Sequence, residues 1–136
     1  MLFWGILLAL LQSSPSFWSY WGDGKAELCS YDVTQNRYGK ERSASVVMIY
    51  VTEPFLKDKQ VKADAPGKDD PNVVQVLKLN RIKKFQTGIY DYSIVSSVFA
   101  PVHNYSIGRD SYTAGAPLKV AMSSQEWWGT VYHQLN

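Results

Sequence analysis

Residues 73–102 read VVQVLKLNRIKKFQTGIYDYSIVSSVFAPV, and this stretch decides the fold. It is rich in β-branched and aromatic residues, and its apolar side chains recur at every second position, which is typical of strands rather than of a helix. Leu77 and Leu79 share one face, and the alternation returns after Gly88 with Tyr90 and Tyr92. We therefore predict two consecutive strands with a break near Gly88.

Further strand patterns lie on both sides of this pair. Residues 26–33 and 45–52 flank a polar turn at 34–42, which predicts an antiparallel hairpin. Residues 118–122 and 127–135 alternate in the same way around a turn at 123–126. The nearly continuous apolar run in 45–52 indicates a strand that is buried on both faces or central in the sheet.

Two stretches carry loop signals instead. Residues 53–72 contain three prolines and nine charged residues, and predict a long exposed connection with a short strand around 60–63. Residues 101–117 form a second loop-rich region. The fold class is therefore all-β or β-dominated, an antiparallel meander of six to seven strands in a curled or barrel-like sheet after an N-terminal apolar segment.

The composition describes one globular domain. The chain has 136 residues, of which 46% are hydrophobic and 19% charged, and the net charge is +2. This charge balance gives no electrostatic support for nucleic-acid binding. We predict a single β-rich domain at residues 17–136, possessing no intrachain disulfide because there is one cysteine. The strand pattern is still running at Asn136, which predicts that the domain is truncated at its C-terminal end.

Residues 1–22 contain no charged side chain. The apolar run 2–11 has the length of a signal-peptide core, and Ser14 and Ser16 precede a cleavage position before Phe17. Residues 1–16 are therefore predicted to be a signal peptide, so that the protein is exported to the periplasm or the cell envelope. The alternative is that residues 1–22 stay as a membrane anchor, with an interfacial belt of Trp18, Tyr20 and Trp21, in a membrane-anchored assembly subunit.

A basic run lies within the first strand of the deciding stretch. Alternation places Lys78 and Lys84 on one face of the strand, and Arg81 and Lys83 on the other. These side chains are candidates for binding an anionic head group or a polyanion. The competing interpretation is a solvated strand edge or hairpin tip, since lysine on exposed strands suppresses aggregation.

Aromatic residues form a second candidate site. On strands, Tyr90 and Tyr92 share a face, and so do Trp128 and Tyr132. Together with Trp127 they would line a cavity with flat apolar surfaces that carry polar tips. The competing interpretation is that these five residues fill a core.

The sequence shows no motif for a metal, a cofactor or a known catalytic class. His103 and His133 are 30 residues apart without metal-ligand spacing, and the chain has no GxSxG, P-loop, GxGxxG or CxxC motif. Metal sites and cofactors are therefore not expected. An envelope hydrolase that uses Asp91 or His133 remains an alternative to a binding domain.

Several segments resemble an uncharacterised family of exported bacterial proteins found in groups such as Bacteroidetes and Acidobacteria. The resemblance covers nearly all of residues 17–136, and its most specific parts are YWGDGKAE at 20–27, VK at 61–62, KLN at 78–80 and FQTGIYDY at 85–92. Some members carry the label septum formation inhibitor, but the Ser-Pro-Arg-Arg motif of those cytosolic pyrophosphatases is absent here. The resemblance implies export, a β-rich fold and a longer chain, but no activity.

These observations favour an exported, envelope-associated domain that performs no catalysis. Its expected partner is a lipid or another amphiphile, or else an envelope protein.

Overall fold

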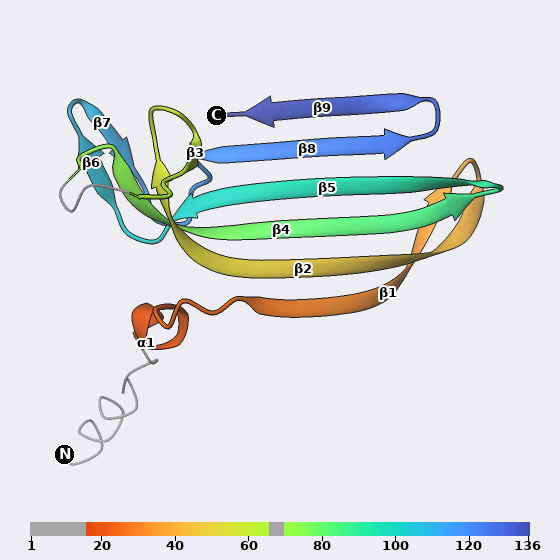
Figure 1. The fold of residues 1–136 in the computed structure, drawn as a ribbon, viewed down its shortest axis with the longest axis horizontal. Coiled ribbons are helices and arrows are strands. Elements are labelled where there is room, and N and C mark those ends of the chain that lie inside the picture. Colours follow the sequence, from red (N-terminus) through yellow and green to blue (C-terminus); the bar gives the residue numbers. More distant parts are fainter. Residues whose placement is uncertain (1–15, 66–69) are drawn as a thin grey trace, which may run out of the picture.

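The computed structural model describes residues 16–65 and 70–136, and an antiparallel sheet dominates it (Figure 1). The elements in chain order are α1 (Phe17–Trp21), β1 (Glu27–Arg37), β2 (Lys40–Leu56), β3 (Val61–Lys62), β4 (Val73–Thr87), β5 (Tyr90–Pro101), β6 (Tyr105–Ile107), β7 (Asp110–Tyr112), β8 (Lys119–Glu126) and β9 (Gly129–Leu135).

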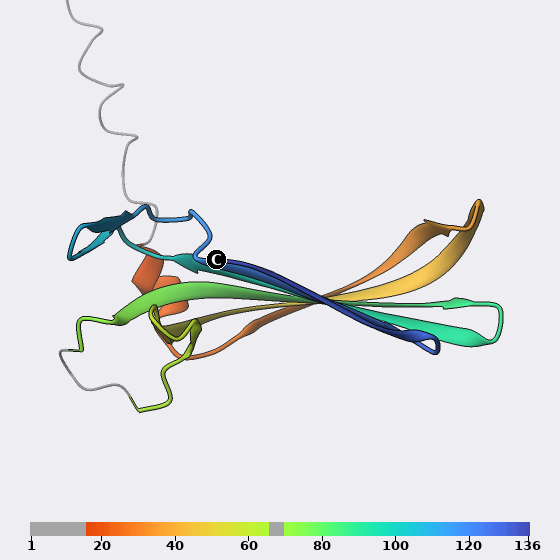
Figure 2. The ribbon, with the colours of Figure 1, turned by 90° about the horizontal axis from the view of Figure 1, so that it is seen from above.

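The main sheet is a meander in the order β1-β2-β4-β5-β8-β9, with β3 added beside β2. The predicted all-β antiparallel architecture is confirmed, and β2 is an interior strand, paired with β1 and β4. In the described residues β1 and β9 are the outer strands and do not pair with each other, so the sheet is open. Figure 2 shows its strong twist and the β1–β2 tip bent out of the plane of its neighbours.

Strands extend further toward the turns than the sequence predicts. Arg37 pairs with Lys40, so the polar stretch 34–42 is mostly paired strand and the turn is only Tyr38-Gly39. Both turn residues have positive φ, 55° and 68°, as a tight hairpin turn of this kind requires. The predicted turn at 123–126 is also wrong, because these residues pair and the turn is Trp127-Trp128.

The loop predictions are wrong at two further places. Residues 53–56 belong to β2, where Phe55 is fully buried. Pro54 is tolerated because its carbonyl accepts from the Ala63 amide, so its own nitrogen also points away from β4. The loop-rich region 101–117 contains the β6–β7 hairpin. The short strand expected around 60–63 is confirmed as β3.

Continuous pairing assigns every side chain of the main sheet to one of two faces, because directly opposite residues share a face. We call face A the face that carries Val46 and Tyr92, and face B the face that carries Phe55 and Phe99. At one end of the sheet, residues of face B form a core with Leu118 and with partly buried side chains of the β6–β7 hairpin: Phe55, Val74, Val76, Phe99, Tyr105, Ile107 and Tyr112.

A second, smaller core lies on face A near the opposite end. It joins Ala44, Phe85 and Tyr92, and partly buried Val33 and Ile94 pack against it. The Phe85 and Tyr92 rings are parallel, with centroids 4.8 Å apart. Between the two cores many side chains of the sheet are only half-buried, so the middle of the sheet is a surface rather than an interior.

The short helix α1 contacts the sheet at the end that holds the larger core. The Thr52 hydroxyl donates to the Trp21 carbonyl at 2.9 Å, and the Trp18 indole donates to His103 Nε2 at 2.7 Å. Among the described residues no helix combines the length and the apolar character needed to cross a bilayer. Residues 1–15 of the predicted signal peptide or anchor lie outside the described part of the chain.

Candidate functional site

Arg81 and Lys83 project from the middle of β4 onto face A. Arg81 lies opposite Met48 of β2 and Ser96 of β5, and Lys83 lies opposite Val46 and Ile94 in the same two strands. The predicted division of the basic run between two faces is confirmed by this pairing. Two cationic side chains therefore stand next to each other within a largely apolar surface.

The surface around these two cations is defined by half-buried or buried apolar side chains of face A. They come from β2, β4, β5 and β8, and we call them the apolar band: Val46, Met48, Leu77, Leu79, Ile94, Val98, Val120 and Met122. Most of these side chains keep part of their surface in water, although they are adjacent. Such a contiguous apolar surface is typical of an interaction site.

The two cations have no anionic partner in the described part of the chain. Lys83 Nζ donates to Gln35 Oε1, which is an uncharged acceptor. None of the ion pairs within the described residues includes Arg81 or Lys83. Loss of hydration, and after it repulsion from Arg81, lowers the pKa of Lys83. An incoming anion would offset both effects, because it attracts both cations.

Two hollows adjoin Lys83 on this face. The larger has a volume of about 350 Å³ and is lined by Tyr31, Val33, Thr34, Gln35, Val46, Met48, Arg81 and Lys83. A smaller hollow of about 110 Å³ shares Gln35 and Lys83 and extends toward Phe85, Tyr92 and Ile94. We call the two hollows together the basic groove. Its larger part falls within the size range of small-molecule sites.

The other two basic candidates lie on face B, away from the basic groove. Lys78 Nζ is 3.3 Å from Glu53 Oε1, and it lies above the Phe99 ring at 5.2 Å. Glu53 is buried, so Lys78 neutralises a carboxylate at the edge of the larger core. Lys84 is exposed and faces a polar hollow. The four basic residues therefore do not form one site.

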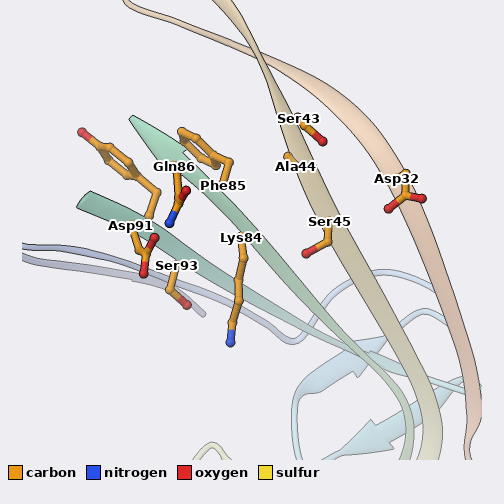
Figure 3. Close-up of a pocket in the computed structure, with 10 residues that line it drawn as sticks. Asp32, Ser43, Ala44, Ser45, Lys84, Phe85, Gln86, Asp91 and Ser93 are labelled. Carbon is orange, nitrogen blue, oxygen red and sulfur yellow. The ribbon is translucent and has the colours of Figure 1, made fainter. Parts of the chain in front are cut away.

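That polar hollow, of about 510 Å³, lies on face B near the hairpin end of the sheet. Figure 3 shows Lys84, Asp91 and Ser93 on the adjacent strands β4 and β5, whereas Asp32 lies across β2 on β1. His133 pairs with Met122 and therefore shares face A. The two residues of the hydrolase alternative, Asp91 and His133, thus lie on opposite faces. Among the described residues no three metal-ligating side chains gather.

The aromatic candidates divide into a packed group and one separate residue. Tyr90 contacts Tyr92, Trp127 and Trp128, with ring centroids 5.9, 6.1 and 6.3 Å apart. The prediction that Tyr90 and Tyr92 share a face is confirmed. Tyr132 lies on face B of β9 and is exposed. The expectation that it shares a strand face with Trp128 is wrong, because Trp128 is in the turn.

Tyr92 also holds the bent β1–β2 tip. Its hydroxyl lies 2.9 Å from that of Tyr38 and accepts from Arg37 Nη2 at 3.3 Å. The Arg37 guanidinium stands over both rings, 4.6 Å from the Tyr38 centroid and 5.1 Å from that of Tyr92. The hydrogen bond with Tyr38, and then that from Arg37, lowers the pKa of Tyr92. The hydrogen bond with Tyr92, and then loss of hydration, raises the pKa of Tyr38.

The residues that complete the basic groove were not expected from the sequence. Tyr31, Gln35 and Met48 come from β1 and β2, and they reach Arg81 and Lys83 only through the register of β1 on β2 and of β2 on β4. Alternation within each strand shows which side chains share a face, but not which residue lies opposite.

Comparison with models of protein families, with curated proteins and with solved structures gave no match for this chain. Its function has to be inferred from the side chains of the candidate site.

Proposed function

We propose that the protein is an exported, envelope-associated binding domain whose face A holds an anionic amphiphile, such as a fatty acid or a lipid with an acidic head group, without catalysis. The observation that carries the proposal is the position of Arg81 and Lys83. They stand inside the apolar band with no carboxylate within ion-pair distance in the described residues. A ligand with one anionic end and one apolar chain fits both features.

Each part of such a ligand has a defined place. The anionic group accepts from the Arg81 guanidinium and the Lys83 ammonium, and each charged hydrogen bond contributes about 1.5–3 kcal/mol. The chain lies along Leu79, Val98 and Val120, where each buried methylene adds about 0.8 kcal/mol. A small inorganic anion gains only the first contribution, so it should bind far more weakly than an amphiphile.

The test is calorimetric titration with dodecanoate below its micelle concentration. We expect Arg81→Gln combined with Lys83→Gln to weaken binding at least about tenfold, which corresponds to about 1.4 kcal/mol. Lys84→Gln is the matched control, because it removes an exposed positive charge from the same strand but on face B. Equal weakening by Lys84→Gln would contradict the proposed site, and so would unaltered binding by the double variant.

Two further probes, one uncharged and one cationic, define the ligand class. For the native protein, dodecanol should bind more weakly than dodecanoate. For the double variant, the two ligands should bind equally well. Dodecyltrimethylammonium should bind weakly to the native protein, because the cations of the groove repel it. Preference for the cationic detergent would contradict an anion site.

The export part of the proposal needs a separate measurement. A native mass spectrum of protein taken from a bacterial envelope fraction reports the N-terminal residue and any retained lipid together. A species that begins at Phe17 and carries a lipid mass is the expected result. A species that keeps Met1 would support the anchored alternative instead.

A further inference from the structure

Three hairpin turns of the main sheet lie at the same end of the molecule, opposite the end that contains α1 (Figure 1). They connect β1 to β2, β4 to β5 and β8 to β9. Each turn places large apolar or aromatic side chains at or beside its tip. We call these side chains the hairpin-tip cluster: Tyr38, Ile89, Tyr90, Trp127 and Trp128.

Ring contacts and one hydroxyl contact connect the aromatic side chains of the three tips. Tyr90 beside the β4–β5 turn touches Trp127 and Trp128 of the β8–β9 turn, and it also touches Tyr92. Tyr92 in turn bonds to Tyr38 of the β1–β2 turn. The aromatic residues are therefore contiguous across the whole end of the sheet, although they come from separate hairpins.

The outermost members are unusually exposed for their size. Trp128 and Ile89 are each 80% exposed, and Trp127 and Tyr38 are each 64% exposed. Turn positions favour Gly, Asn, Asp, Ser and Pro, so a Trp-Trp turn departs from ordinary turn chemistry. Both indoles belong to residues beyond the last paired residues of β8 and β9.

The backbone of the tips suits a nonaqueous partner. The last pairs before the turns are Arg37 with Lys40, Thr87 with Tyr90, and Glu126 with Gly129. Only two residues at each turn lie outside the ladder, so few polar backbone groups lose water when the tips enter an apolar environment. Trp and Tyr, with an apolar ring and one polar atom, are the side chains that favour the boundary between water and lipid.

Charges near the tips are balanced. Three basic residues, Arg37, Lys40 and Arg42, accompany three acidic ones, Glu41, Asp91 and Glu126. A bilayer partner would therefore be bound through aromatic insertion rather than through attraction to anionic lipids. This predicts weak dependence on salt and on lipid charge, which distinguishes the cluster from the basic groove.

We propose that the hairpin-tip cluster inserts into the interfacial layer of a lipid bilayer, including one made only of zwitterionic lipid. This site is separate from the proposed ligand site on face A, which depends on Arg81 and Lys83. The two proposals fail independently, because the tip needs no anionic group.

The experiment measures partition of the protein onto phosphatidylcholine vesicles, with tryptophan quenching by brominated lipid as the readout of depth. The native protein should bind, its fluorescence should be quenched, and raising the salt from about 0.1 M to about 0.5 M should change partition less than about twofold. Trp127→Ser combined with Trp128→Ser should lower partition at least about tenfold, since serine suits a turn and both indoles are lost.

Three variants complete the experiment. Ile89→Asn should also weaken partition while leaving both indoles in place. Tyr20→Ser, which removes an exposed ring at the opposite end, should leave partition unchanged. The Arg81→Gln, Lys83→Gln double variant should also partition normally. Absence of vesicle binding by the native protein would overturn the proposal, and a protein would then be the remaining candidate partner of the tips. Unchanged binding by the Trp variant, or binding that salt abolishes, would overturn it as well.

Discussion

Lys83 has surroundings that are poorly suited to its charge. It stands opposite Val46 and Ile94, next to another cation. Within the described residues its ammonium group donates to an amide oxygen and lies over the Phe85 ring, 5.7 Å from the centroid, but has no anionic partner. An unpaired charge in such a place costs stability. Its retention in the apolar band is understandable if the charge serves binding, and this is the residue-level basis of the proposed function.

The lowered pKa of Lys83 predicts a pH dependence of binding. As pH rises through this lowered pKa, Lys83 loses its proton below the usual lysine range and dodecanoate affinity falls, although the ligand stays ionised. Lys83→Arg should keep its affinity over the same range, because arginine stays charged. Titrations between about pH 7 and about pH 10 test this; parallel loss in both proteins would exclude Lys83 as the titrating group.

The lowered pKa of Lys83 also determines whether the stability of the folded protein rises or falls with pH. Because the folded state holds the Lys83 proton less tightly than the unfolded state, stability from this group is present above the unfolded pKa. It is lost as pH falls through the folded pKa. The anionic ligand should therefore stabilise the protein most when Lys83 is protonated.

A small set of side-chain contacts connects the bent tip of the β1–β2 hairpin to β5. Its tip reaches β5 through the hydroxyl pair of Tyr38 and Tyr92 and through Arg37, which stands over both rings. Beneath them, Tyr92 stacks on Phe85. Tyr92 thus connects the curvature of the hairpin to the smaller core.

Two substitutions at Tyr92 separate these roles. Tyr92→Phe keeps the stack but loses the hydroxyl contacts, and should lower the free energy of unfolding by about 1 kcal/mol. Tyr92→Ala also removes the ring, and should cost about 3 kcal/mol or more. Urea unfolding measures both, and Tyr132→Phe on exposed β9 should stay within about 0.5 kcal/mol of the native protein. Equal effects of Tyr92→Phe and Tyr132→Phe would mean that the hydroxyl contacts contribute nothing.

The strands were more predictable than the turns between them. Alternation in residues 73–102 predicts β4, β5 and the faces of Arg81 and Lys83, because a half-buried sheet imposes a period of two. Turn predictions from composition are wrong at two places. Strand pairing continues through the polar stretch 34–42, and two tryptophans form the turn after β8. The basic groove depends on register between β1, β2 and β4, which no local pattern in one strand contains.

For the whole molecule, the meander topology means that each strand is stabilised mainly by its neighbours in the sheet. The principal contacts between the elements of the main sheet join only strands that are adjacent in it. β9 is an outer strand whose side chains are all exposed, whereas β4 is paired on both sides. Opening should therefore begin at the edges and cost progressively more free energy toward β4.

Hydrogen exchange followed by mass spectrometry checks this gradient. We expect amides of β9 to exchange first and those of β4 last, with β1 slower than β9 because Arg37 and Tyr38 fasten its tip. Tyr92→Phe should accelerate exchange in β1 and leave β9 unchanged. Identical exchange rates in β4 and β9 would show that the sheet opens as one cooperative unit.

The separation of α1 from the hairpin tips also restricts how the molecule can be oriented. These features lie at opposite ends of the long axis in Figure 1, and the 15 residues of β4 alone extend over about 50 Å. With the tips embedded and the sheet upright, α1 stands far above that bilayer. A tether at the α1 end would then have to come from a second surface facing the first, and the length of the sheet would act as a spacer that sets the gap between them.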